Sequence, residues 1–221
     1  MRPAVVAPSR RRFVLGVALA GLVPVAGCGH AGTLVVVSPH PDDETLRLSG
    51  YVLHARDRGD HLVLVAVTRG AASGAAPASW SAERLEAVRS AELEDAWAAL
   101  TGERGTITHL ELPDGGLTES AVAEALSPVL EEHPDAVVAA ACATDDDHPD
   151  HRVVARVVRR LAGDRSRTAL PPGAQGGRIW DCPDLPAARR ADAAYAPFGH
   201  RSVSGLFDDL RAADHRSAVL G

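Results

Sequence analysis

The sequence predicts a single α/β domain built on a mostly parallel sheet with helices on both faces. Its length of 221 residues fits one domain, and a hydrophobic content of 46% is enough for one core. After residue 32, continuous apolar runs rich in β-branched residues alternate with stretches in which apolar residues have helical spacing. This alternation is typical of βαβ units, whose strands are parallel.

Four apolar runs are expected to form the strands of this sheet. They are TLVVVS, HLVLVAV, TITHLEL and DAVVAAA, at residues 33–38, 61–67, 106–112 and 135–141. Strands that are apolar at consecutive positions are buried on both faces, because successive side chains point to opposite sides of a sheet. Both faces of the sheet should therefore be covered by helices.

The stretches after the strands are expected to form helices, at residues 43–58, 81–101, 118–133 and 150–162. Ser81 before the second helix and Gly102 after it are suitable caps. The composition of 163–204 is typical of a loop with one strand near Ile179, and a last helix over 204–218 should close the domain.

The first 32 residues differ from the rest and are expected to be an export signal with a short tether, followed by a domain at 33–221. Arg10, Arg11 and Arg12 precede a short apolar run and small residues before Cys28, which is the layout of a signal peptide. The arginines resemble a twin-arginine signal, and VAGC resembles a lipoprotein cleavage site. We therefore expect an exported protein, either anchored to the membrane by a lipid on Cys28 or extracellular. An uncleaved anchor, or an extension upstream of the true start, is the alternative.

The net charge and the cysteine content bear on the expected binding partners and disulfides. The net charge of −6 offers no basic field for a polyphosphate, so we expect no nucleic-acid partner. Cys142 and Cys182 form no CxxC site, and the sequence leaves open whether they pair after export. It also leaves the oligomeric state open.

Two loops rich in histidine and aspartate follow the first and fourth expected strands. They are contained in VVVSPHPDDETL (35–46) and TDDDHPDHR (144–152). In an open parallel sheet, ligands bind where the carboxyl ends of strands meet the starts of helices. If the two strands are neighbours, the loops face each other across a crevice, and a divalent metal would compensate their charge.

Zinc is the metal that best suits these side chains. Neutral imidazoles and carboxylates are zinc ligands, and a catalytic zinc takes three protein ligands and leaves one position open. His40, Asp43 and a histidine from either His148 or His151 would supply the three. Each loop alone has a simpler explanation, because HxxD and HxxH occur by chance and Asp145 to Asp147 can cap a helix. Two such loops at matching strand ends favour the metal site.

Five sequence segments over roughly residues 33–160 together resemble a known family. They are SPHPDDETL, TRG (68–70), ERLEAVRSAELEDAWAALTG (83–102), LPDGGL (112–117) and HPDHR (148–152). In this order they resemble the LmbE-like, or PIG-L, family of zinc-dependent N-acetylglucosaminyl de-N-acetylases. The resemblance implies a Rossmann-like α/β fold. It also implies hydrolysis of the N-acyl group of an amino sugar in a small molecule or an oligosaccharide.

The resemblance also implies roles for individual residues. It makes His40, Asp43 and His151 the zinc ligands and Asp42 the general base. An amide carbonyl is a weak electrophile, which is why such hydrolysis needs a metal that polarises the carbonyl and acidifies a water. Asp42, next to a ligand without being one, is suited to accept the proton of that water.

Three further residues receive roles in the same way. A protonated His148 would stabilise the oxyanion or protonate the leaving amine, and Asp150 would orient it and favour its charge. Arg69, in the TRG segment, would contact the substrate.

The sequence departs from the family in the segments expected to form the substrate walls. Arg47-Leu48-Ser49-Gly50 replaces the usual glycine-rich run, and Ala71 replaces an acid. Hydrolysis of another bond, such as an ester or phosphoester, therefore stays open, as does an exported sugar-binding protein without activity. Asp42 argues against the binding protein, because a protein that only binds sugar needs no base. Export favours a cell-wall fragment or a secreted glycosylated natural product as substrate.

Overall fold

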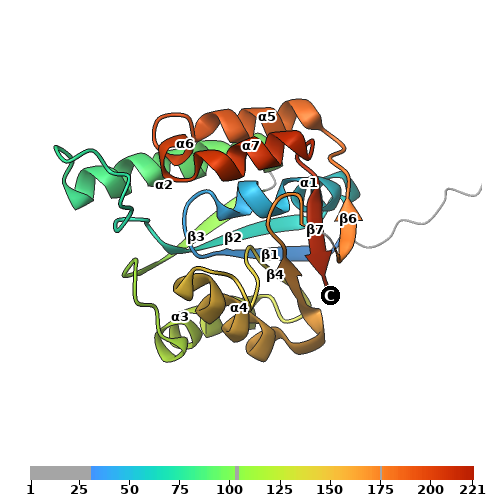
Figure 1. Ribbon diagram of the computed structural model, residues 1–221. Coiled ribbons are helices and arrows are strands. Elements are labelled where there is room, and N and C mark those ends of the chain that lie inside the picture. The colour runs from blue at the N-terminus through green and yellow to red at the C-terminus, as the bar shows by residue number, and fades with distance from the viewer. Residues whose placement is uncertain (1–30, 103–104, 175) are drawn as a thin grey trace, which may run out of the picture.

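The computed structural model describes residues 31–102, 105–174 and 176–221, which form a seven-stranded sheet covered by helices on both faces (Figure 1). The strands are β1 (Thr33–Ser38), β2 (His61–Thr68), β3 (Gly105–Leu112), β4 (Val137–Ala140), β5 (Ser166–Ala169), β6 (Arg178–Trp180) and β7 (Ser217–Leu220). The helices are α1 (Asp43–Arg58), α2 (Ala82–Thr101), α3 (Glu119–Glu132), α4 (Pro149–Ala162), α5 (Leu185–Ala194), α6 (Gly199–Ser202) and α7 (Ser204–Ala212).

The strand order is β3-β2-β1-β4-β5-β7-β6, and the first five strands in this order are parallel. Strand β1 pairs with β2 on one side and with β4 on the other, so that Val35 lies beside both Val63 and Val138. The direction in which the chain winds reverses between β1 and β4. The helices that follow these two strands, α1 and α4, therefore lie on opposite faces of the sheet, and a crevice lies between them at the carboxyl ends of the strands. The predicted α/β fold, with its mostly parallel sheet, is confirmed.

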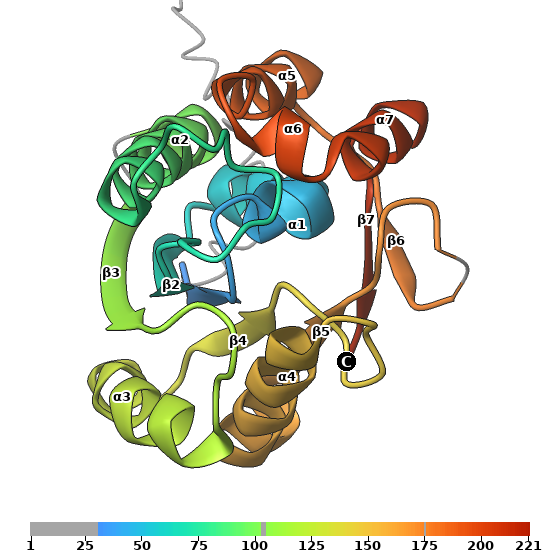
Figure 2. The same cartoon turned by 60° about the vertical axis from the view of Figure 1, so that its left-hand side comes forward.

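Alternation along the central strands divides the apolar side chains between two cores. Val36 and Leu64 are buried against α1, α2, α5 and α7, whereas Val35 and Val65 are buried against α3 and α4. Figure 2 shows the two helical layers on opposite sides of the sheet. Cys142 belongs to the second core and Cys182 packs against the first. Both cysteines are free, so the pairing that the sequence left open is not formed.

The expectation of a loop over 163–204 is wrong for much of its length. The strand near Ile179 is present as β6, but β5 and the helices α5 and α6 were not predicted. Helix α5 forms because Asp184 caps it, with its carboxylate accepting the backbone N–H of Ala187 at 3.0 Å. Its alanines bury one face against the first core, and alanine has the highest helix propensity.

The last predicted helix, over 204–218, is too long by several residues. Helix α7 ends at Ala212, and Asp214 and His215 then have positive φ angles of 49° and 56°, which a helix does not allow. After this turn, β7 inserts antiparallel between β5 and β6. Burial of β7 between these two strands stabilises the chain more than further turns of α7 would.

Gly50 lies where α1 packs against β6 and the segment that leads into β7. A Cβ atom at this position would lie 2.7 Å from the carbonyl oxygen of Trp180 and 3.2 Å from that of His215. We expect Gly50→Ala to lower the free energy of unfolding by about 1–3 kcal/mol, because backbone must move to make room. Gly205→Ala, in α7 and with no atom within 4 Å of the added carbon, is the matched control and should be neutral or stabilising. Equal denaturation midpoints for the two variants would contradict this packing.

Among the described residues, no helix is both long and apolar enough to cross a membrane. Residues 1–30, which hold the predicted export signal, its arginines and Cys28, lie outside the described residues.

Candidate active site

The two predicted loops lie side by side at the carboxyl ends of β1 and β4. The first loop turns sharply at Asp42, whose φ of 116° is rare for a residue other than glycine. Such a conformation persists only where the surroundings fix it, and it occurs preferentially at functional sites. Here the Asp42 carbonyl accepts the N–H groups of Thr45 and Leu46, while its own N–H donates to Glu44. Helix α1 begins directly after this turn, and α4 begins in the second loop.

His40, Asp43 and His151 converge on one point. His40 Nδ1 lies 3.3 Å from Asp43 Oδ2, and His151 Nε2 lies 3.1 Å from the same oxygen and 3.1 Å from His40 Nδ1. A zinc ion with ligand distances of about 2.0–2.1 Å in tetrahedral geometry separates its ligands by about 3.3–3.4 Å. The spacing of the three atoms therefore fits zinc.

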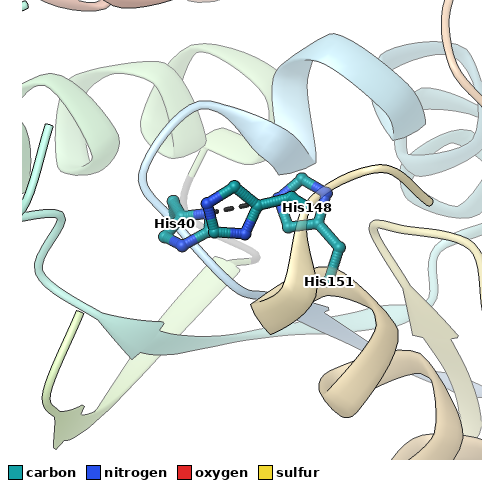
Figure 3. Close-up of side chains that lie close together, drawn as sticks. All are labelled: His40, His148 and His151. Atoms are coloured by element: carbon teal, nitrogen blue, oxygen red, sulfur yellow. Dashed lines mark hydrogen bonds between the residues drawn. The ribbon is translucent and has the colours of Figure 1, made fainter. Parts of the chain in front are cut away.

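His148 lies beside the other two imidazoles. Its ring centroid is 4.7 Å from that of His40 and 4.9 Å from that of His151. Figure 3 shows the three rings together, one on the loop after β1 and two at the start of α4. His40, His148 and His151 also form a group whose nitrogen atoms lie close enough to share a metal. The geometry alone thus offers His148 as an alternative ligand to Asp43.

Carboxylates lie close to the second ring nitrogen of His40 and of His151, the nitrogen that does not take part in the convergence. Asp146 Oδ1 lies 3.0 Å from His151 Nδ1, and Asp114 Oδ1 lies 3.2 Å from His40 Nε2. Metal-binding histidines commonly donate their second N–H to a carboxylate, which fixes the ring and its tautomer. The two distances place Asp146 and Asp114 within reach of this role, although neither nitrogen forms an aligned hydrogen bond with any described residue. No role at the metal site was predicted for Asp114 or Asp146, and the helix cap that the sequence allowed for Asp145 to Asp147 is instead His148. The presence of the two aspartates in LPDGGL and TDDDHPDHR was the only signal in the sequence.

The electrostatics of the cluster favour a cation. Burial alone would lower the pKa of His151, but Asp43 and Asp146 outweigh it and raise that pKa to about 9. Burial alone would raise the pKa of Asp43, but His151 and His40 hold it well below its usual range. The carboxylates therefore stabilise positive charge at the point where the three ligand atoms converge.

Asp42 forms a buried ion pair with Arg89, an arginine for which no role was predicted from the sequence. Its Oδ2 lies 2.8 Å from Arg89 Nη2, and both side chains are only 5% exposed. Burial raises the pKa of Asp42 to about 7, although Arg89 acts in the opposite direction. A carboxylate whose pKa lies near neutrality is well suited to accept a proton at neutral pH.

Asp150 contacts His148 through its backbone. The N–H of Asp150 donates to His148 Nδ1 at 3.2 Å, which places the proton of a neutral His148 on Nε2. The Asp150 carboxylate instead accepts the N–H groups of Gly115, Gly116 and Leu117 at 2.9–3.1 Å. It thereby fixes the loop after β3, which carries Asp114. The predicted roles of His148 and Asp150 remain predictions.

A cavity of about 940 Å³ opens over the cluster. His40, Asp42, Asp43, His148 and His151 all line it. Apolar side chains from α1, α7 and the loops form part of its wall: Leu46, Leu170, Pro171, Val203 and Leu206.

Arg69 is not among the described residues that line the cavity. It donates to Ser90 Oγ at 3.1 Å and to Glu111 Oε1 at 2.6 Å. The arginines in the wall are Arg47 and Arg89. Contact between Arg69 and the substrate remains a prediction.

The family profile described as "PIG-L: GlcNAc-PI de-N-acetylase" matches residues 35–162, which is more than half of the chain. The chain belongs to the PIG-L family. This confirms the resemblance identified in the sequence and makes the protein a member of a deacetylase family. The match includes both histidine loops and the segment that carries Arg89. No curated protein sequence matches this PIG-L chain.

Solved structures share the fold of this PIG-L protein. The conserved protein TT1542 from Thermus thermophilus has a TM-score of 0.66 at 20% identity, over 85% of this chain and 93% of that one. The N,N'-diacetylchitobiose deacetylase from Pyrococcus horikoshii has a TM-score of 0.62 at 21% identity, over 80% and 76%. The zinc-inhibited form of teicoplanin deacetylase Orf2 has a TM-score of 0.58 at 19% identity, over 85% and 98%. At these identities the likeness shows the fold alone.

Proposed function

We propose that this PIG-L protein is a zinc-dependent hydrolase that removes the N-acetyl or another N-acyl group from a glucosamine unit of a glycoconjugate. The observation that carries the proposal is the convergence of His40, Asp43 and His151 within 3.3 Å of one another beside Asp42. Membership of a de-N-acetylase family supports the reaction class. The zinc-inhibited deacetylase with the same fold supports the choice of metal.

In this proposal His40, Asp43 and His151 hold the metal, and Asp114 and Asp146 orient the two histidines. Zinc, when bound, supplies the Lewis acidity that polarises an acyl carbonyl and acidifies a water. Asp42 accepts the proton of the attacking water while Arg89 holds its carboxylate in place. His148 presents Nε2–H to the developing oxyanion, since its Nδ1 accepts the N–H of Asp150. The proton that Asp42 has taken from the water passes to the leaving amine as the C–N bond breaks.

The cavity supports a substrate larger than one sugar ring. Its volume of about 940 Å³ lies near the upper end of the range for small-molecule sites. Two proteins with a similar fold are an N,N'-diacetylchitobiose deacetylase and a teicoplanin deacetylase. We therefore infer that the substrate is derived from cell wall or is a secreted glycosylated natural product. The net charge of −6 supports a partner other than nucleic acid.

The test is hydrolysis by the purified full chain, first freed of metal and then loaded with Zn²⁺ or Mg²⁺. N,N'-diacetylchitobiose and N-acylglucosaminyl glycopeptides serve as substrates, and mass spectrometry follows the loss of the acyl group. We expect the zinc-loaded protein to release the free amine and a chelator to stop it. Hydrolysis of model esters without any amide hydrolysis would replace this proposal with another hydrolase. Sugar binding without turnover would replace it with a binding protein.

We also propose that residues 1–32 direct export and that Cys28 carries a lipid anchor. The arrangement of Arg10, Arg11 and the small residues before Cys28 supports this. Replacing Arg10 and Arg11 by lysine should hold the protein in the cytoplasm, and Cys28→Ala should release it from the membrane fraction. Fractionation with an antibody to the domain measures both. Unchanged fractionation of both variants would point to a plain anchor or to a start site further along the chain.

A further inference from the structure

Arg47 is a buried arginine in the wall of the cavity that the proposed chemistry does not use. It lies on α1 one turn after Asp43, and its side chain is 5% exposed. Its Nη2 lies 2.8 Å from Asp146 Oδ2, and its Nε lies 3.9 Å from Asp43 Oδ1. The guanidinium is therefore tied by one carboxylate and borders the metal-binding cluster.

Two nitrogen atoms of this guanidinium lack a hydrogen-bond partner among the described residues. They are Nε and Nη1, and both are buried. A buried donor without an acceptor destabilises a fold, and it does so more strongly when it is charged. The pair with Asp146 needs only one nitrogen, so it does not account for the other two. An acceptor in the cavity would.

The surroundings indicate what kind of acceptor this is. Asp146 already balances the charge of Arg47, and Arg89, the other arginine in the wall, is balanced by Asp42. Six aspartates line the cavity in total. A phosphate or carboxylate entering here would meet their negative charge, whereas a hydroxyl or carbonyl oxygen would accept a hydrogen bond without that repulsion.

We propose that Arg47 is a substrate-binding residue that donates hydrogen bonds from Nε or Nη1 to an uncharged oxygen of the glycosyl group. The proposal rests on the proposed function, since it assumes that a sugar occupies the cavity. It predicts that the cavity prefers uncharged N-acylglucosaminyl groups to those that carry a carboxylate on a ring substituent.

Arg47→Lys separates this role from simple charge balance. Lysine keeps a cation for Asp146 but removes the planar guanidinium and its two free donors. We expect unchanged zinc content by elemental analysis, a kcat near that of the wild type, and a KM for N,N'-diacetylchitobiose raised about 10- to 100-fold, the usual effect of losing a hydrogen bond from a charged group. Arg58→Lys, on the exposed last turn of the same helix, should change none of these values.

A binding measurement keeps the test independent of turnover. Calorimetry gives the dissociation constant of N,N'-diacetylchitobiose for two zinc-loaded proteins, the single variant Asp42→Asn and the double variant that combines Asp42→Asn with Arg47→Lys. The sugar should bind more weakly to the double variant, by the same factor as the change in KM. N-acetylmuramic acid, which is N-acetylglucosamine with a lactyl ether that carries a carboxylate at O3, should bind more weakly than N-acetylglucosamine to the protein that retains Arg47.

Each contrary result has a distinct meaning. Unchanged KM and dissociation constant in Arg47→Lys would show that Arg47 only balances charge. Loss of zinc in Arg47→Lys, as expected for Asp146→Asn, would show that it acts through Asp146 and His151. Tighter binding of N-acetylmuramic acid would overturn the uncharged acceptor. If no N-acylglucosaminide is hydrolysed but the sugar binds in an Arg47-dependent way, the proposed function fails and the role of Arg47 stands. If the sugar does not bind at all, the role of Arg47 fails.

Discussion

His151→Ala is expected to remove both metal and activity. Its Nε2 lies 3.1 Å from Asp43 Oδ2 and from His40 Nδ1, so the variant leaves two of the three converging ligand atoms. The loss of metal affinity should exceed the roughly 10- to 100-fold loss that is typical when a residue only orients a ligand. Elemental analysis should give one zinc per wild-type chain and almost none in the variant, and competition with a chelator gives the change in affinity.

His61→Ala is the control for histidine replacement. His61 is exposed at the first residue of β2, at the opposite end of the strand from the cluster, and it should leave the zinc content unchanged. His148→Ala tests the alternative ligand set and should also keep most of the zinc. A fully loaded His151→Ala would overturn the assignment, and a metal-free His148→Ala would place His148 among the ligands. Circular dichroism spectra of the three variants show whether each is folded.

Some strands of the sheet can be predicted from the sequence and others cannot. Strands β1 and β2 are buried on both faces, so their apolar runs are continuous and unmistakable. Strands β5 and β7 lie toward one side of the sheet and have only four residues each. Strand β5 also contains three polar residues, Ser166, Arg167 and Thr168. Short strands of this kind have no periodicity that distinguishes them from loop, and their pairing depends on partners far away in the chain.

The candidate site shows the same limit. Both histidine loops were predicted to meet because the carboxyl ends of adjacent parallel strands share one edge of the sheet, and the pairing of β1 with β4 brings them together. Asp114 and Arg89 enter the site from the loop after β3 and from α2, and sequence spacing does not indicate which side chains of those segments point inward. The carboxylate of Asp150 could not be placed for the same reason. Its hydrogen-bond partners are backbone N–H groups, which every loop carries, and its Oδ2 also lies 3.6 Å from His40 Nε2.

Asp42→Asn is expected to separate proton transfer from metal binding. Asn keeps the shape of the side chain and an oxygen that can accept from Arg89, but it cannot act as a base. Asp42 pairs with Arg89 at 2.8 Å rather than with the cluster, so zinc content should match that of the wild type. The rate of amide hydrolysis should fall by roughly 10²–10⁴, the usual range for losing positioned acid–base help. Steady-state kinetics on zinc-loaded protein measure the rate.

The buried pair of Asp42 with Arg89 also predicts an effect of Asp42→Asn on thermal stability. Replacing one partner of a buried ion pair leaves the other charge without compensation, so the thermal midpoint of Asp42→Asn should fall even though the fold and the zinc are kept. Arg89 also donates to the carbonyl oxygens of Pro41 and Gly70, and these bonds limit the loss. A wild-type rate in this variant would place the base elsewhere. Loss of zinc would make Asp42 a ligand and leave Asp43 as the candidate base. Circular dichroism distinguishes this outcome from unfolding, because an unfolded protein would also lose the spectrum of the native fold.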